Sequence, residues 1–164
     1  MKSLLKDKTV LRALIFTELM ILVTSIHHVY RLGLEPLIPA VALFTVPLLL
    51  MWWHSRGRDR LSSWVYAGYV GIVFFYFGIV DGFLDHVAKA VGLNNMTFLP
   101  GSDADVIETV YHLWSPEAGS IFYEATGIMT FVWGLAAMFF VFRFVRRTAI
   151  QSPATRNGVT EARA

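Results

Sequence analysis

Four long runs of hydrophobic residues dominate the chain, and short polar segments separate them. The runs cover about residues 10–30, 37–53, 62–87 and 118–142. A helix needs about 20 predominantly apolar residues to cross the hydrocarbon core of a bilayer, and each run is close to or above that length. The pattern predicts an all-α integral membrane protein in which four transmembrane helices form one bundle within residues 1–149.

The segments outside these runs predict two further features. Pro100-Gly101 marks a turn, and residues 102–114 then begin with acidic side chains and carry apolar residues on one side. Because acidic residues stabilise a helix N-terminus, we expect a short amphipathic helix here, in the outer loop between the third and fourth spans, lying on the membrane surface and capping the bundle. Residues 150–164 are small and polar, and we expect them to form a disordered tail.

Composition supports the membrane assignment and excludes several chemistries. Of the 164 residues, 55% are hydrophobic and only 16% are charged, which is unusual for a soluble protein. The chain has no cysteine, which excludes disulfide exchange, cysteine-ligated iron–sulfur clusters and covalently attached c-type haem. Glu18 interrupts the first run, so we expect a retained span rather than a cleaved signal peptide. We expect the protein to lie in a lipid bilayer and to bind no nucleic acid.

The basic residues are unevenly distributed along the chain. All of the 14 lysines and arginines except Arg31 and Lys89 lie near the chain termini or between the second and third runs. Because cytoplasmic loops are enriched in lysine and arginine, both termini are predicted to be cytoplasmic, in a membrane that we expect to be a bacterial inner (plasma) membrane. The loop that follows the third run then faces the outer side.

Titratable residues gather at the predicted outer ends of the helices. The third run closes with Asp81-Gly-Phe-Leu-Asp85-His86. Of the 5 histidines, only His54 lies at the cytoplasmic side, and the others are His27, His28, His86 and His112. Ionisable groups are costly inside a bilayer and usually face the interior of a bundle, where they mark a functional site. We therefore expect these side chains to face one another.

Helical spacing places carboxylates and imidazoles on three stripes that are suited to packing. Residues three and four apart share one face of an α-helix, which places His28 on a stripe that runs from Leu11 through Glu18. Asp81 and Asp85 share a second stripe, and Glu124 lies on a third. An α-helix rises by about 1.5 Å per residue, so the positions of these side chains along the helices predict their depth. They fall into two layers, and Glu18 lies deeper than both. The outer layer holds His28 and Asp85 with His27, His86 or His112, and the inner layer holds Asp81 and Glu124.

Imidazole and carboxylate groups together favour a transition-metal site. Imidazole suits zinc, copper and iron, whereas carboxylates suit harder ions such as manganese, and a cation offsets the cost of burying negative charge. The expected ligands are His28, Asp85, His86 and His112, with Asp81 and Glu124 as second ligands or proton acceptors and His27 as a further candidate. An open coordination position would permit catalysis or redox chemistry. The spacing matches no established motif, so the metal, the number of ions and the presence of any enzymatic activity stay open.

Three alternative interpretations use the same residues. The chain can be an accessory subunit of a larger membrane complex, or a homo-oligomer, in which protonated buried acids serve packing. A b-type haem can be held by two histidines on facing helices, such as His27 or His28 with His86, although the carboxylates make that pocket polar. A proton-coupled transporter would use acids at several depths as a relay, although the inner halves of the stripes are apolar.

Overall fold

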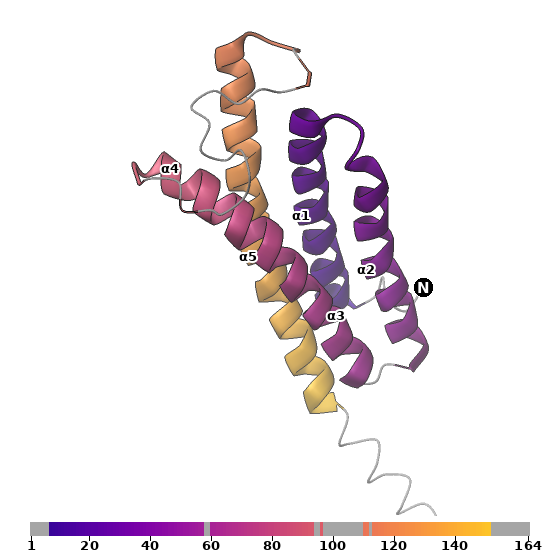
Figure 1. Cartoon of the computed structure of the whole chain (residues 1–164). Helices are drawn as coiled ribbons and strands as arrows, with labels where there is room; N and C mark the ends of the chain where they lie inside the picture. Colours follow the sequence, from indigo (N-terminus) through magenta and orange to yellow (C-terminus); the bar gives the residue numbers. More distant parts are fainter. Residues whose placement is uncertain (1–6, 58–59, 94–95, 97–109, 112, 152–164) are drawn as a thin grey trace, which may run out of the picture.

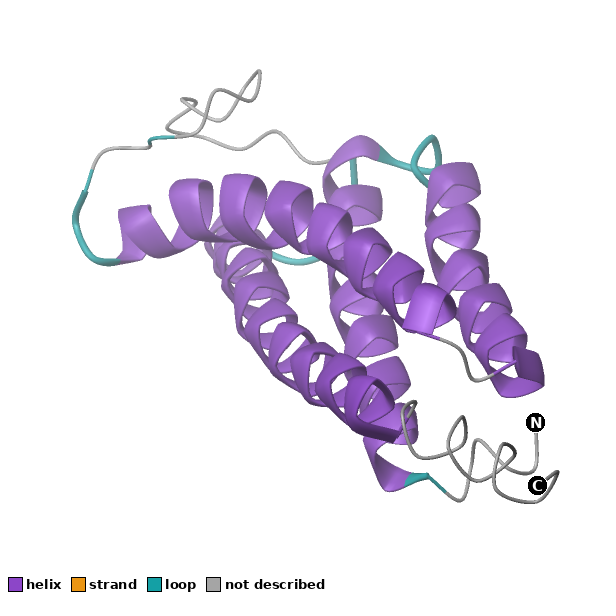
Figure 2. Cartoon of the chain, turned by 90° about the horizontal axis from the view of Figure 1, so that it is seen from below, coloured by secondary structure: helices purple, strands orange, loops and turns teal. Residues whose placement is uncertain are grey.

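The structure, a computed structural model, describes residues 7–57, 60–93, 96, 110–111 and 113–151. This part of the chain contains helices and connecting segments and no strand (Figures 1 and 2). Four helical rods within it are long and apolar enough to cross a membrane. They are α1 (Lys8–Leu32), α2 (Leu37–Gly57), a continuous rod from Arg60 to Ala90, and α5 (Pro116–Gln151). The all-α class and the four candidate spans are therefore confirmed.

The helices extend beyond the predicted hydrophobic runs, and α5 does so most. The fourth run was expected to end at residue 142, but α5 continues to Gln151. The added segment is amphipathic, because Phe144 is buried whereas Arg143 and Arg146 are exposed. A hydrophobicity criterion stops at the first group of charged residues, whereas helical hydrogen bonding continues past it.

The third rod changes its helical geometry along its length. It begins as α3 (Arg60–Val73), continues as the π-helix η1 (Phe74–Val87) and ends in the short helix α4 (Ala88–Ala90). At the end of η1 the backbone N–H of Ala88 donates to the carbonyl of Phe83, five residues earlier. Turns of this wider kind are rare and frequently lie at functional sites.

The rods form a bundle in which α5 has a central place. Figure 1 shows α1 beside α2, and α5 packs against α1, α3 and η1. Asp7 caps the N-terminus of α1 by accepting a hydrogen bond from the backbone of Thr9 at 3.0 Å. The same carboxylate accepts a hydrogen bond from Arg147 of α5 at 2.8 Å, so the start of α1 lies beside the end of α5.

The two halves of the bundle differ in polarity. Near the start of α1 the interior is mainly apolar and aromatic, with a core that includes Met20, Met51, Tyr66 and Phe144, and no aspartate among the described residues is buried there. In the other half, near the end of α1, the buried side chains include histidines and aspartates. The apolar half holds the helices together, and the polar half contains the candidate site.

The stripe predicted for α1 is displaced by one residue. Glu18 and His28 were expected to face the bundle, but both are only half-buried. The buried stripe instead contains Thr17, Thr24 and His27. Small side chains let helices approach closely, and Thr17 accordingly packs in the interior, where its hydroxyl accepts a hydrogen bond from Tyr66 of α3 at 3.0 Å. On α5, Glu124 is half-buried and its carboxylate lies against His86 of η1, while the neighbouring Tyr123 is fully buried.

The connection between α4 and α5 is described only in part. Most of the predicted amphipathic helix and His112 lie outside the described residues, as do residues 152–164 of the predicted tail. The described residues 110–111 and 113–114 are not helical. The Trp114 ring lies 4.9 Å from the ring of Phe122 and 5.9 Å from that of Tyr30, so this segment covers the adjoining ends of α1 and α5.

Candidate metal centre

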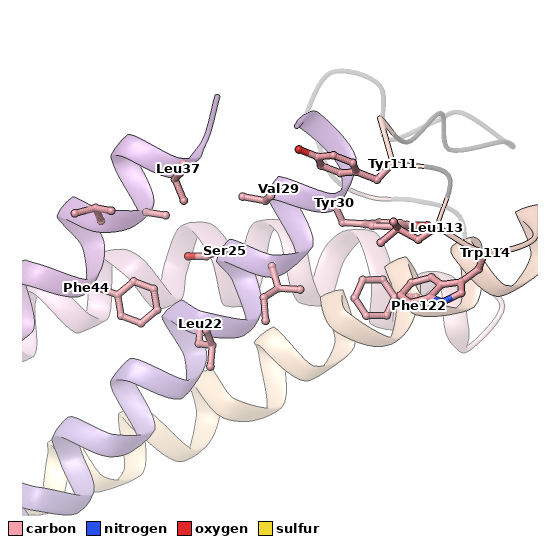
Figure 3. A pocket seen from close by; sticks show the side chains of 13 residues that line it. Leu22, Ser25, Val29, Tyr30, Leu37, Phe44, Tyr111, Leu113, Trp114 and Phe122 are labelled. Atoms are coloured by element: carbon pink, nitrogen blue, oxygen red, sulfur yellow. The ribbon is translucent and has the colours of Figure 1, made fainter. Parts of the chain in front are cut away.

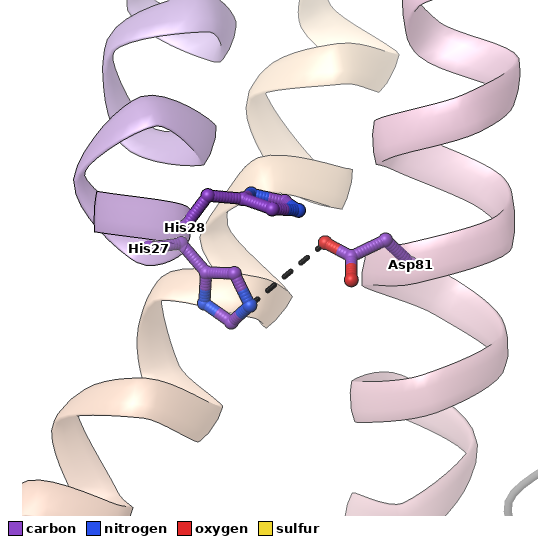
Figure 4. A group of neighbouring side chains, drawn as sticks. All are labelled: His27, His28 and Asp81. Carbon is purple, nitrogen blue, oxygen red and sulfur yellow. Dashed lines mark ion pairs between the residues drawn. The ribbon is translucent and has the colours of Figure 1, made fainter. Parts of the chain in front are cut away.

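Five imidazole and carboxylate side chains from two helices converge in the polar half of the bundle. His27 and His28 come from α1, and Asp81, Asp85 and His86 come from η1. Figure 4 shows the two α1 imidazoles pointing towards Asp81 across the space between the helices. The Nε2 atom of His27 lies 3.9 Å from Oδ2 of Asp81, and Nε2 of His86 lies 3.9 Å from Oδ2 of Asp85.

The π-helical geometry of η1 brings three of these side chains to one face. In an α-helix, Asp81 and Asp85 would share a face while His86 turned away from it. In the wider turn of η1, the residues four and five positions after Asp81 point towards the same side, and these residues are Asp85 and His86. Asp81, Asp85 and His86 are consequently all buried.

The tautomer of His27 follows from its hydrogen bonds. Its Nδ1 atom lies 3.0 Å from the hydroxyl of Thr126 on α5. That hydroxyl donates its own proton to the carbonyls of Phe122 and Tyr123, each at 2.9 Å, so it accepts from His27. With the hydroxyl proton used in this way, the proton of His27 lies on Nδ1 and the lone pair of Nε2 faces Asp81.

His86 and His28 are oriented in the same manner. The Nδ1 atom of His86 donates to Oε2 of Glu124 at 2.8 Å, and the other oxygen of Glu124 accepts from Lys89 at 2.8 Å. The Nδ1 atom of His28 donates to the backbone carbonyl of Thr24 at 2.8 Å. In its neutral form, each of the three imidazoles would thus present a lone pair on Nε2. Metal-binding histidines typically have this arrangement, in which a hydrogen bond from the second ring nitrogen fixes the ring.

Three buried atoms in this cluster lack a hydrogen-bond partner in the described part of the chain. They are Nε2 of His27, Nε2 of His86 and Oδ2 of Asp81. These three residues are 1%, 0% and 4% exposed, respectively. An unsatisfied buried polar atom costs about 1–3 kcal/mol. With both imidazoles neutral and protonated on Nδ1, all three atoms are electron-pair donors that cannot satisfy one another, whereas metal cations bound beside them would satisfy them.

Aromatic and glycine residues hold the imidazoles in place. The ring of Tyr123 stacks on His27 with 4.1 Å between centroids, and its hydroxyl accepts a hydrogen bond from Arg31 at 2.7 Å. On the other side, a Cβ atom at Gly127 would overlap the ring of His86. The absence of a side chain at Gly127 therefore makes the space that His86 occupies against α5.

The structure brings together most of the residues predicted for the site. His27, His28, Asp81, Asp85 and His86 supply the converging atoms. Glu124 was expected beside Asp81, but its carboxylate contacts His86 and Lys89 instead. His112 lies outside the described residues.

Sequence reasoning missed the groups that orient the imidazoles. These are the hydroxyl of Thr126, the carbonyl of Thr24 and the ammonium of Lys89. Thr126 lies three residues after Tyr123 on the buried face of α5, which is the only sequence signal that could have identified it.

A second concave feature lies on the other side of α1. It is an open groove of about 590 Å³ between α1, α2 and the segment before α5 (Figure 3). Leu22, Phe44 and Trp114 contribute to its almost entirely apolar lining, which contains none of the five converging residues. Its surface suits hydrocarbon, and it offers no convergent polar groups for chemistry.

Comparison with known proteins adds no further constraint on the function. The chain matches no protein-family profile, no curated protein and no solved structure. The chemistry of the cluster is therefore argued from its donor atoms alone. Three imidazoles and two carboxylates form a donor set suited to divalent transition-metal ions.

Proposed function

We propose that this protein is an integral membrane protein that binds divalent transition-metal ions in a buried centre. The ligands are His27, His28, Asp81, Asp85 and His86. The observation that carries the proposal is the set of three buried, unsatisfied donor atoms from two helices, with imidazoles held by hydrogen bonds through Nδ1. Zinc, iron, manganese and copper are the candidate ions, because mixed imidazole and carboxylate donors suit them.

The geometry favours a metal ion over the alternative occupants. The rings of His27 and His86 are 4.8 Å apart and nearly perpendicular, at 84°, which leaves no space between them for a haem macrocycle. A protonated Asp81 gains no hydrogen bond to His27 through Oδ2, because the 3.9 Å between Oδ2 and Nε2 is too long for one. A proton relay towards Glu18 would have to pass the buried side chains of Met20 and Ile21.

The distribution of charge supports an orientation for the centre. Lys8, Arg12 and Arg147 belong to the end of the bundle opposite the metal centre. By the positive-inside tendency, this end faces the cytoplasm and the centre lies towards the outer side. Lys89 and Glu124, which are partly exposed, connect His86 to that surface. A metal ion with an open coordination position there could activate water or oxygen, so we regard catalysis as an extension of metal binding.

Metal content tests this proposal directly. The full chain, purified in detergent, is incubated with zinc chloride, freed of unbound metal by gel filtration and analysed for zinc by mass spectrometry. We expect the wild type to retain stoichiometric zinc and Asp81→Asn, which has the same shape, to lose it. A wild-type protein without retained zinc, or an Asp81→Asn variant that retains as much, would refute the proposal.

A matched control is available at the opposite end of the bundle. His54 is also buried, and its Nδ1 atom lies 2.8 Å from the hydroxyl of Ser62. His54→Gln therefore removes a buried imidazole without touching the proposed centre. Its zinc content should equal that of the wild type.

A further inference from the structure

We infer that the centre holds two metal ions bridged by the carboxylate of Asp81, an inference that rests on the proposed metal-binding function. The five side chains fall into two groups of three rather than one group of five. One group is His27, His28 and Asp81, and the other is Asp81, Asp85 and His86. Within each group the ligand atoms lie within 4.8 Å of one another, and Asp81 is the member that both groups share.

Bond lengths limit what a single ion can reach. Bonds from zinc to imidazole nitrogen or carboxylate oxygen are about 2.0–2.2 Å, so two ligands of one ion cannot lie more than about 4.4 Å apart. Each group needs only a small contraction to satisfy that limit. A carboxylate has two oxygen atoms and can bind one ion through each, and ions in two-metal sites lie about 3.5–4 Å apart. Asp81, placed between the two pairs of ligands, has the position that a bridge requires.

The two positions differ in their donor atoms. The position on the α1 side has two imidazoles and one carboxylate, whereas the position within η1 has one imidazole and two carboxylates. Nitrogen-rich sites favour zinc or copper, and oxygen-rich sites favour harder ions such as manganese. The pair is therefore asymmetric, with the softer ion beside His27 and His28.

The charge balance indicates what completes the coordination. Asp81 and Asp85 supply two negative charges, and the carboxylate of Glu124 is paired with Lys89 at 2.8 Å. One divalent ion would be neutralised by the two aspartates, whereas two divalent ions leave two positive charges in a buried site. Each ion also has only three protein ligands. An anionic oxygen ligand between the ions, hydroxide in the resting protein, would fill the open positions and reduce the residual charge.

Zinc stoichiometry separates two ions from one. We expect two zinc ions per wild-type chain, one in His28→Ala, one in Asp85→Asn and none in Asp81→Asn, measured on full-length protein whose helical content is checked by circular dichroism. One ion in the wild type and none in either His28→Ala or Asp85→Asn would overturn the two-ion inference and leave metal binding intact. No zinc in the wild type would refute both.

Magnetic coupling gives a second readout, and its deciding measurement uses the wild-type protein alone. Wild-type protein loaded with two equivalents of manganese should show the broadened electron paramagnetic resonance signal of two coupled ions. His28→Ala loaded with one equivalent should show the resolved six-line signal of an isolated ion. An isolated six-line signal from the fully loaded wild type would overturn the inference.

Discussion

Gly127→Ala should weaken metal binding without removing any ligand. A Cβ atom at this position would overlap the ring of His86. The backbones of α5 and η1 are also close here, because a Cβ placed on Gly82 would lie 2.9 Å from the carbonyl oxygen of Gly127. The added methyl group must therefore displace the imidazole, whose Nδ1 atom is held by Glu124.

The size of the effect follows from the cost of overpacking. Extra methyl groups in a packed interior cost about 1–3 kcal/mol. About 1.4 kcal/mol corresponds to a tenfold change in affinity. If the whole cost falls on the metal-binding position of His86, zinc affinity should drop by about 5- to 140-fold. Competition with a chromophoric chelator measures this change, and thermal unfolding of the metal-free protein in detergent measures the general packing cost.

Gly134→Ala provides the matched control on the same helix. A Cβ atom there would overlap the ring of Phe74, in a part of the interface that contains no proposed ligand. We expect this variant to unfold at a lower temperature but to bind zinc as tightly as the wild type once folded. Equal zinc affinity in Gly127→Ala and the wild type, or equal losses in the two alanine variants, would refute the assignment of Gly127 to the positioning of His86.

Three further substitutions test the groups around the centre. Thr126→Val removes the acceptor for Nδ1 of His27 and should lower zinc affinity about 10- to 100-fold; Thr126→Ser should restore it, and failure of this rescue would contradict the hydrogen-bond role. Glu124→Gln removes the negative charge that orients His86 and should also weaken zinc binding, with undiminished affinity as the contrary result. Glu18→Gln should leave zinc content unchanged, because Glu18 belongs to neither group of converging ligands; reduced zinc content would connect this acid to the centre.

The number of helices was predictable from the sequence, but their ends were not. Long apolar runs predict helices of membrane-spanning length, so the four candidate spans follow from hydrophobicity. The last turns of α5 are amphipathic, and they are held at the start of α1 by the hydrogen bond from Arg147 to Asp7. Such a contact joins residues far apart in sequence, and a local hydrophobicity pattern contains no information about it.

The membership of the site was predictable in part, because ionisable residues are conspicuous within apolar helices. Which of His27 and His28 is fully buried was not predictable, because several faces of α1 are apolar. The small residues Thr17 and Thr24 lie on the face that packs, which is the face of His27. The π-helical turns of η1 leave no recognisable pattern in the sequence, yet they determine that His86 faces inward together with Asp85. These two features explain why the predicted stripes are displaced while most of the predicted residues still meet.

The most direct test of the metal centre is the X-ray absorption spectrum of zinc-loaded wild-type protein at the zinc edge. The convergence of the imidazole Nε2 atoms predicts nitrogen and oxygen ligands at about 2.0–2.1 Å, with the outer-shell scattering that is characteristic of imidazole rings. A spectrum of zinc surrounded by oxygen alone, with no imidazole scattering, would contradict the proposal that His27, His28 and His86 bind metal.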